Sequence, residues 1–130
     1  MSPMRRDLLY WRWSGAILAL VAALGFLLVA RRQASLAGGL LVFDTTHNIL
    51  HAALAAFALA FATGLPPAGV SRRVAGWTGV VYLALAALGF LSERLFGLGP
   101  LVGMRLETSE NALHLALGAW GAKVGFGEEK

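Results

Sequence analysis

Long uncharged stretches alternate with short polar ones along the 130-residue chain. No Asp, Glu, Lys or Arg occurs in residues 13–30, 45–71 or 74–92. A helix needs roughly 20 apolar residues to cross a bilayer core about 30 Å thick. The pattern therefore predicts three membrane-spanning helices, over about residues 12–30, 45–63 and 74–92.

A fourth span is predicted over about residues 107–125, although its uncharged part, residues 111–122, is short. Glu107 and Glu110 can lie at one headgroup layer, and Lys123 can extend to the other. We include this span because its sequence resembles that of the second span. Every connection between the four spans is too short to form a separate domain.

The two halves of the chain repeat each other. Residues 43–57 read FDTTHNILHAALAAF and residues 106–120 read LETSENALHLALGAW, while residues 13–27 and 77–91 share a Trp and two Gly at a nearly equal shift. The nearly constant distance in sequence between the matching segments predicts one duplicated helical hairpin. The expected fold is an all-α integral membrane four-helix bundle built from two tandem parallel two-helix repeats, related by a pseudo-two-fold axis along the membrane normal. The single domain covers residues 1–130, with repeat 1 over about 12–64 and repeat 2 over about 75–125.

The composition supports a membrane protein, because 58% of the residues are apolar, 14% are charged and the mean hydropathy is +0.68. The absence of cysteine excludes disulfides, thiolate catalysis and cysteine metal sites. The arginine pair Arg31–Arg32 directly after the first span is unlike a signal-peptide cleavage region, so we expect that span to be retained.

The net charge of +4 comes from basic clusters beside the apolar spans. Four spans would put both termini on one side, with seven Lys and Arg there against four on the other. The positive-inside rule then predicts a multi-pass protein of the bacterial inner membrane with cytoplasmic termini. This charge pattern indicates contact with lipid headgroups and not with nucleic acid.

A row of polar side chains opens the second span and recurs in the fourth. An acid, an Asn and a His follow one another at i, i+4 and i+7, which places them on one helix face. The histidines should lie roughly 10 Å below the acids, at a depth where polar groups turn away from lipid. We therefore expect both rows to face the bundle interior, where they can face each other. The six candidate ligand-binding residues are Asp44, Asn48, His51, Glu107, Asn111 and His114.

Two interpretations of these rows remain open. In the structural one, Asn and His form hydrogen bonds between helices, each contributing about 0.6–2 kcal/mol. In the other, a site lies between the halves. It would be a bis-imidazole haem site with His51 and His114 as axial ligands, or a pocket for protons or a small polar ligand.

A third histidine, His47, lies four residues before His51 and aligns with Glu110 in the second repeat. This would allow a metal pair on one helix or a His/Glu set. The segment HNILH lacks the glutamate of the zinc-protease motif, and we interpret His47 as a headgroup-level histidine. No other metal site is predicted, and the chain has no catalytic triad, P-loop or dinucleotide fingerprint, so no catalytic residue is predicted.

The chain resembles a family of small bacterial four-helix membrane proteins catalogued as domain of unknown function 4383, over about residues 13–122. Ala55 departs from the family pattern where a glycine would be common, and Gly118 retains it in the second copy. The resemblance implies the fold and the membrane location but no reaction. It is carried by an acid-x-x-His-Asn-x-x-His run, a second Asn-x-x-His and a Gly-x-x-Tyr third helix, here Asp44, His47, Asn48, His51, Asn111, His114 and Gly79–Tyr82.

We therefore expect a small, non-enzymatic membrane protein that serves as a structural or accessory subunit of a membrane assembly. Its partners would be the lipid bilayer and another membrane protein or a second copy of the chain, packed on an Ala/Gly-rich face. The alternative is a ligand- or haem-binding bundle that uses the paired histidines. A visible absorption spectrum distinguishes the haem form of that alternative from a colourless protein.

Overall fold

Four helices make up almost all of the described structure. The computed structural model describes residues 5–30, 35–36, 41–42, 45–91 and 108–128. Its helices are α1 (Arg6–Ala30), α2 (Thr45–Ala62), α3 (Ala68–Leu91) and α4 (Thr108–Phe126). The predicted all-α class with four helices is confirmed. Two helices, α1 and α3, begin earlier than predicted because charged residues end an apolar span but do not end a helix.

A short β-ladder lies between α1 and α2. Strand β1 (Ser35–Leu36) pairs antiparallel with β2 (Leu41–Val42), so that Ser35 is opposite Val42 and Leu36 is opposite Leu41. The sequence predicts only a loop over residues 31–43, because two-residue strands are too short to produce a periodic pattern. The short interfacial helix predicted around residues 93–98 lies outside the described residues.

A glycine follows the C-terminal end of two helices, α2 and α4. Gly64 has a φ of 79°, a left-handed conformation that follows helix ends, and its amide donates to the Phe61 carbonyl at 3.2 Å. Pro66 and Pro67 then separate α2 from α3. At the end of α4, the Gly127 amide donates to the Lys123 carbonyl at 2.9 Å.

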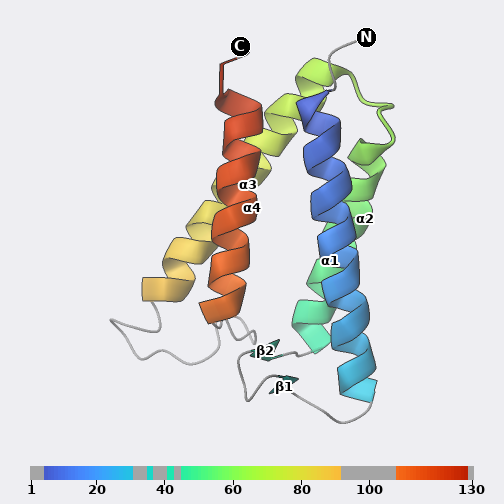
Figure 1. The fold of residues 1–130 in the computed structure, drawn as a ribbon, viewed down its shortest axis with the longest axis vertical. Helices are drawn as coiled ribbons and strands as arrows, with labels where there is room; N and C mark the ends of the chain where they lie inside the picture. Colours follow the sequence, from blue (N-terminus) through green and yellow to red (C-terminus); the bar gives the residue numbers. More distant parts are fainter. Residues whose placement is uncertain (1–4, 31–34, 37–40, 43–44, 92–107, 129–130) are drawn as a thin grey trace.

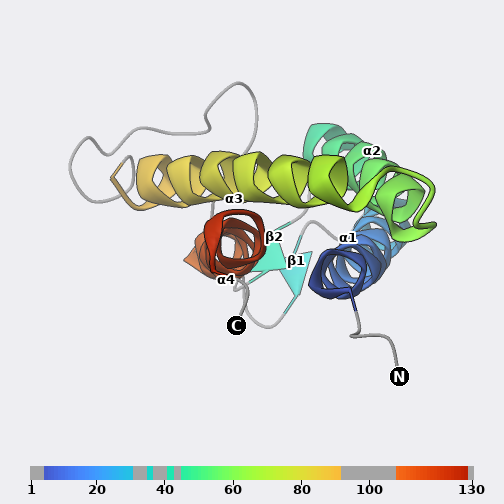
Figure 2. The ribbon, with the colours of Figure 1, turned by 90° about the horizontal axis from the view of Figure 1, so that it is seen from above.

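The helices pack as two hairpins. The most extensive contacts join α1 to α2 and α3 to α4, and fewer contacts join α1 to α3 and α4. The chain runs along the long axis four times, so the start of α1 and the end of α4 lie at the same end (Figure 1). Seen along that axis, α1 and α4 are viewed nearly end-on while α3 runs obliquely (Figure 2).

Three layers of side chains fill the space between the hairpins. An aromatic layer near the start of α1 contains Tyr10 and Trp11, packed with Ala58, Ala75 and Val124. A middle layer contains four residues, one from each helix: Leu18, Ala55, Tyr82 and Leu117. The third layer, at the opposite end from the aromatic one, is polar and consists of histidines and a glutamate.

Three of the helices, α1, α2 and α3, are long and apolar enough to cross a membrane. Within the described ranges, α4 does not reach the same apolarity, because Glu110, Asn111, His114 and Lys123 interrupt it. A membrane span for α4 therefore stays a prediction.

Candidate metal centre

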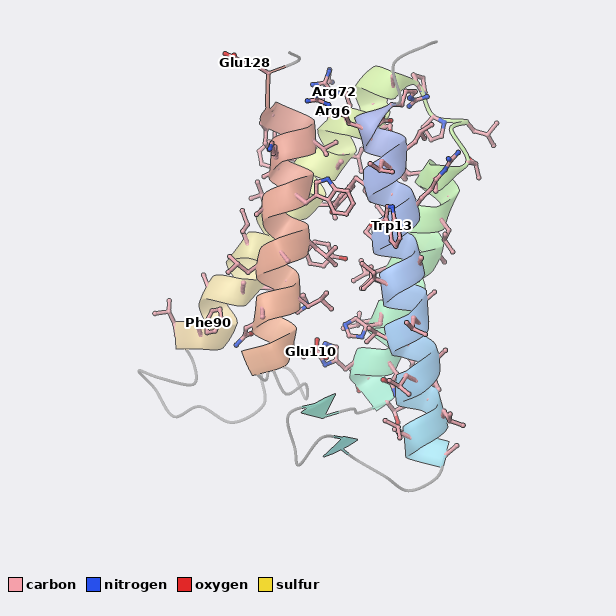
Figure 3. All side chains as sticks on the ribbon, viewed as in Figure 1. Arg6, Trp13, Arg72, Phe90, Glu110 and Glu128 are labelled. Carbon is pink, nitrogen blue, oxygen red and sulfur yellow. The ribbon has the colours of Figure 1, made fainter. Side chains whose placement is uncertain are left out.

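Three histidines and a glutamate from two helices meet at the polar end of the bundle. The helix α2 contributes His47 and His51, and α4 contributes Glu110 and His114. Each offers one ligand atom, and these four atoms all lie within 4.8 Å of one another. All four residues are buried. Figure 3 shows Glu110 pointing from α4 toward α2.

The spacing of these residues explains why they converge. Each helix presents its two ligands four residues apart, which is about one helical turn and therefore the same face. Because the two faces are opposed, the four groups form a compact set without any contribution from a loop.

The Glu110 carboxylate lies between two imidazoles. Its Oε2 atom is 3.3 Å from Nε2 of His47 and 3.6 Å from Nε2 of His51. The two imidazole rings lie against each other, with centroids 4.4 Å apart and planes tilted by 37°. The carboxylate thus joins α4 to two successive turns of α2.

Buried polar and aromatic groups surround this set. The Tyr82 ring of α3 stacks on the His114 ring, with centroids 5.6 Å apart and an interplanar angle of 15°. Asn48 and Asn111, each adjacent in sequence to a ligand, are 0% exposed. The Asn111 amide packs against Gly89 of α3, where an added Cβ would overlap it. Tyr82 and Asn111 therefore restrict how the α4 ligands can move.

Several polar atoms near the set lack a protein partner. Within the residues that the structure describes, the side-chain amides of Asn48 and Asn111 and Nδ1 of His114 accept and donate no hydrogen bond. Buried polar atoms are nearly always paired, because leaving them unpaired costs about 1–3 kcal/mol each. Their placement around the ligand atoms indicates that this region accommodates water or an ion.

The ligand set suits a divalent transition metal. Zinc binds four ligands at about 2.0–2.2 Å in a tetrahedron, which separates the ligand atoms by roughly 3.3–3.6 Å. The two Glu110–imidazole distances, 3.3 and 3.6 Å, fall at these separations, and the other pairs of ligand atoms lie within 4.8 Å. Imidazole with carboxylate is also a ligand set for Fe²⁺, Mn²⁺ and Ni²⁺.

A haem does not fit the same residues. Bis-imidazole ligation requires His51 and His114 to face each other across an open porphyrin plane. Here Glu110 Oε2 is 3.6 Å from His51 Nε2, and the His47 ligand atom lies within 4.8 Å of every other one. The four groups lie too close together in this arrangement for a macrocycle between His51 and His114, whereas their separation suits a single ion.

The six residues predicted from the polar rows have different outcomes. His51 and His114 lie in the cluster, and Asn48 and Asn111 are buried beside it. Asp44 and Glu107 lie outside the described residues.

His47 and Glu110 are not among the six candidate residues predicted from the polar rows. From the sequence, His47 is interpreted as a headgroup-level histidine, whereas in the structure it is 4% exposed and contacts Glu110. The signal that identifies the pair is their alignment in the two repeats, combined with the four-residue spacing from a histidine in each copy.

No family model, curated protein or solved structure matches the chain. The resemblance noted from the sequence stays a prediction.

Proposed function

We propose that the chain is an integral membrane protein that holds one divalent transition-metal ion between two helical hairpins. The observation that carries this proposal is the buried set of four ligand atoms, all within 4.8 Å of one another. Three imidazoles and one carboxylate supply the metal with four ligands, which completes a tetrahedral site. The proposed activity is the binding of the ion itself.

The surface supports the membrane part of the proposal. Large apolar side chains are exposed on the outside of the helices, among them Leu20 at 70%, Trp77 at 60% and Val81 at 57%. So many exposed large apolar side chains are unusual for a monomer in water and are matched by lipid. Three helices meet the length and apolarity of a span, and we propose α4 as a fourth in a bacterial inner membrane, with both termini in the cytoplasm.

The internal packing supports two tandem hairpin repeats. Gly15 of α1 lies against Leu59 of α2, and its counterpart Gly79 of α3 lies against α4. The sequence-equivalent pair His47 and Glu110 enters the same cluster from the two hairpins. Duplication of one hairpin accounts for a site whose ligands come equally from both halves.

The desolvation cost of the buried ligands favours an ion in this site. A buried carboxylate and three buried imidazoles lose their hydration, and one carboxylate oxygen facing two imidazoles compensates only part of that cost. A bound divalent cation interacts favourably with the carboxylate and with the imidazole lone pairs. The unpaired amides of Asn48 and Asn111 lie beside the ligands and could hold water next to the ion.

The metal content of the purified protein tests the proposal. Protein purified from membranes without chelator should contain about one transition-metal ion per chain by elemental analysis, or bind one from added Zn²⁺, Fe²⁺ or Mn²⁺. His51→Ala and Glu110→Ala should lose at least about 100-fold in affinity, because each removes a direct ligand. Ser14→Ala is the matched control. It removes a buried hydroxyl in the first half of α1, beside Trp11, and should retain the ion. Wild-type protein without metal after these additions would disprove the proposal.

A second candidate function is a structural one, an accessory subunit in which the same groups only join helices. It is favoured by the contacts of Glu110 with His47 and His51, which link α4 to α2 without an ion. In that case, loss of Glu110 should lower the free energy of unfolding by about 3–5 kcal/mol in protein already free of metal. Mild-detergent purification should then also retain a membrane-protein partner or a second copy. A Soret band, which the crowded geometry argues against, would instead indicate haem.

A further inference from the structure

A second pocket lies at the other end of the bundle, between α1 and α4. It has a volume of about 350 Å³ and is lined by Arg6, Leu9, Trp120, Lys123 and Val124. A neighbouring pocket of about 460 Å³ shares its two cations and is completed by Gly127 and Glu128. One wall is therefore basic and the other is apolar.

The two shared cations, Arg6 and Lys123, pair with no acidic residue that the structure describes. Within the described part of the chain, neither Arg6 nor Lys123 forms an ion pair, and both side chains are exposed. By contrast, Arg5 pairs with Asp7, whose hydrogen bond raises the pKa of the Arg5 guanidinium. Arg72 donates to the carbonyl oxygens of Val124 and Gly127, each at 3.4 Å. Arg6 and Lys123 therefore face the pocket with positive charge that no described carboxylate pairs with.

Figure 3 shows Arg6 and Arg72 at this end of the bundle, near the ends of α1 and α4. Among the described residues, Glu128 is the one acidic residue that lines either pocket. Two cations against one carboxylate leave the pocket with a net positive charge.

We propose that this pocket binds an anionic phospholipid, with its phosphate held by Arg6 and Lys123 and an acyl chain lying along Leu9, Trp120 and Val124. The inference rests on the membrane part of the proposed function and is independent of the metal. Arg and Lys bind phosphate oxygens by charge-assisted hydrogen bonds, and Trp residues concentrate at the membrane interface. A phosphate ion alone would leave the apolar wall unused, whereas a phospholipid uses both walls.

Native mass spectrometry of the full chain in detergent tests this inference, with phosphatidylglycerol and phosphatidylcholine added at equal concentration. Wild-type protein should retain phosphatidylglycerol over phosphatidylcholine. The double variant Arg6→Gln/Lys123→Gln should bind phosphatidylglycerol roughly tenfold to thirtyfold more weakly, because each cation at a membrane surface contributes separately to attraction. The double variant Arg12→Gln/Arg73→Gln removes the same charge from exposed residues outside the pocket and should bind like wild type.

Three outcomes would overturn the inference: equal retention of the two lipids by wild type, equal losses in the two double variants, or displacement of the lipid by millimolar inorganic phosphate. Elemental analysis of the same samples keeps the two proposals separate. Loss of lipid preference with a retained ion would overturn the lipid site alone. Protein recovered from the soluble fraction would overturn the membrane proposal on which the lipid site rests.

Discussion

The two ends of the bundle join the same two hairpins with opposite chemistry. At the aromatic end, Tyr10 and Trp11 of α1 pack against α2, α3 and α4, and the Trp11 indole donates to Ser71 Oγ at 3.1 Å. At the polar end, two imidazoles of α2 meet a carboxylate and an imidazole of α4. The side chains that connect the hairpins are buried at both ends, so the two ends differ in the chemistry of these side chains and not in their exposure.

The difference between apolar and polar contacts bears on the role of the polar end. At the aromatic end the contacts between the hairpins are mainly apolar, and the buried Asp7 carboxylate there is paired with Arg5. Replacing a buried ion pair by well-packed apolar residues is often neutral or stabilising, so charged groups are a poor choice for stability alone. The polar end is therefore better explained by a ligand than by the needs of the fold.

The largest expected effect is at the aromatic end. Trp11→Ala should lower the free energy of unfolding in mixed micelles by about 3–5 kcal/mol, because it removes a fully buried indole and leaves a cavity. Circular dichroism during denaturant titration measures the change. The folded fraction should keep its metal content, since Trp11 lies in a different layer from the ligands. Loss of metal in that fraction would show that the two ends are coupled.

Removal of the metal should have the next largest effect on the free energy of unfolding. This effect should require the ligands at the polar end. An ion present at about 100 times its dissociation constant stabilises the folded state by about 2.7 kcal/mol. Chelator should remove that increment from wild type and from Ser71→Ala, and should change nothing in His51→Ala. A wild-type protein indifferent to both chelator and added metal would support the purely structural interpretation of the polar end.

The metal increment should also depend on pH. Imidazoles bind metal only when deprotonated. The four groups that would face the ion are His47, His51, His114 and Glu110. The stabilisation by metal should be largest at alkaline pH and should decrease as the pH falls, because protons compete for the ligands. In His51→Ala the metal-dependent shift should be absent at every pH, and an increment that grows on acidification would contradict the assignment.

The helices could be predicted well from the sequence because apolar periodicity and the absence of charge are local signals. The inward direction of His51 and His114 also followed from spacing alone. His47 could not be assigned in the same way, because its position near the start of α2 fits a headgroup layer equally well. Only the packing of α2 against α4 shows that Glu110 lies 3.3 Å from it. The β1–β2 ladder was missed because a two-residue pair has no periodic signal.

The smallest expected effect concerns the hydrogen bond between the Trp11 indole and Ser71 Oγ at the aromatic end. Ser71→Ala removes the Oγ acceptor of the Trp11 indole but leaves the Ser71 carbonyl oxygen, 3.4 Å from the same nitrogen. The free energy of unfolding should therefore fall by no more than about 1 kcal/mol. Ser14→Ala is the matched control, because its hydroxyl is equally buried and bonds only within α1, to the Trp11 carbonyl at 3.4 Å. A loss for Ser71→Ala as large as that for Trp11→Ala would mean that this end, too, depends on a polar contact. The two ends of the bundle would then no longer differ in whether apolar or polar contacts connect the hairpins.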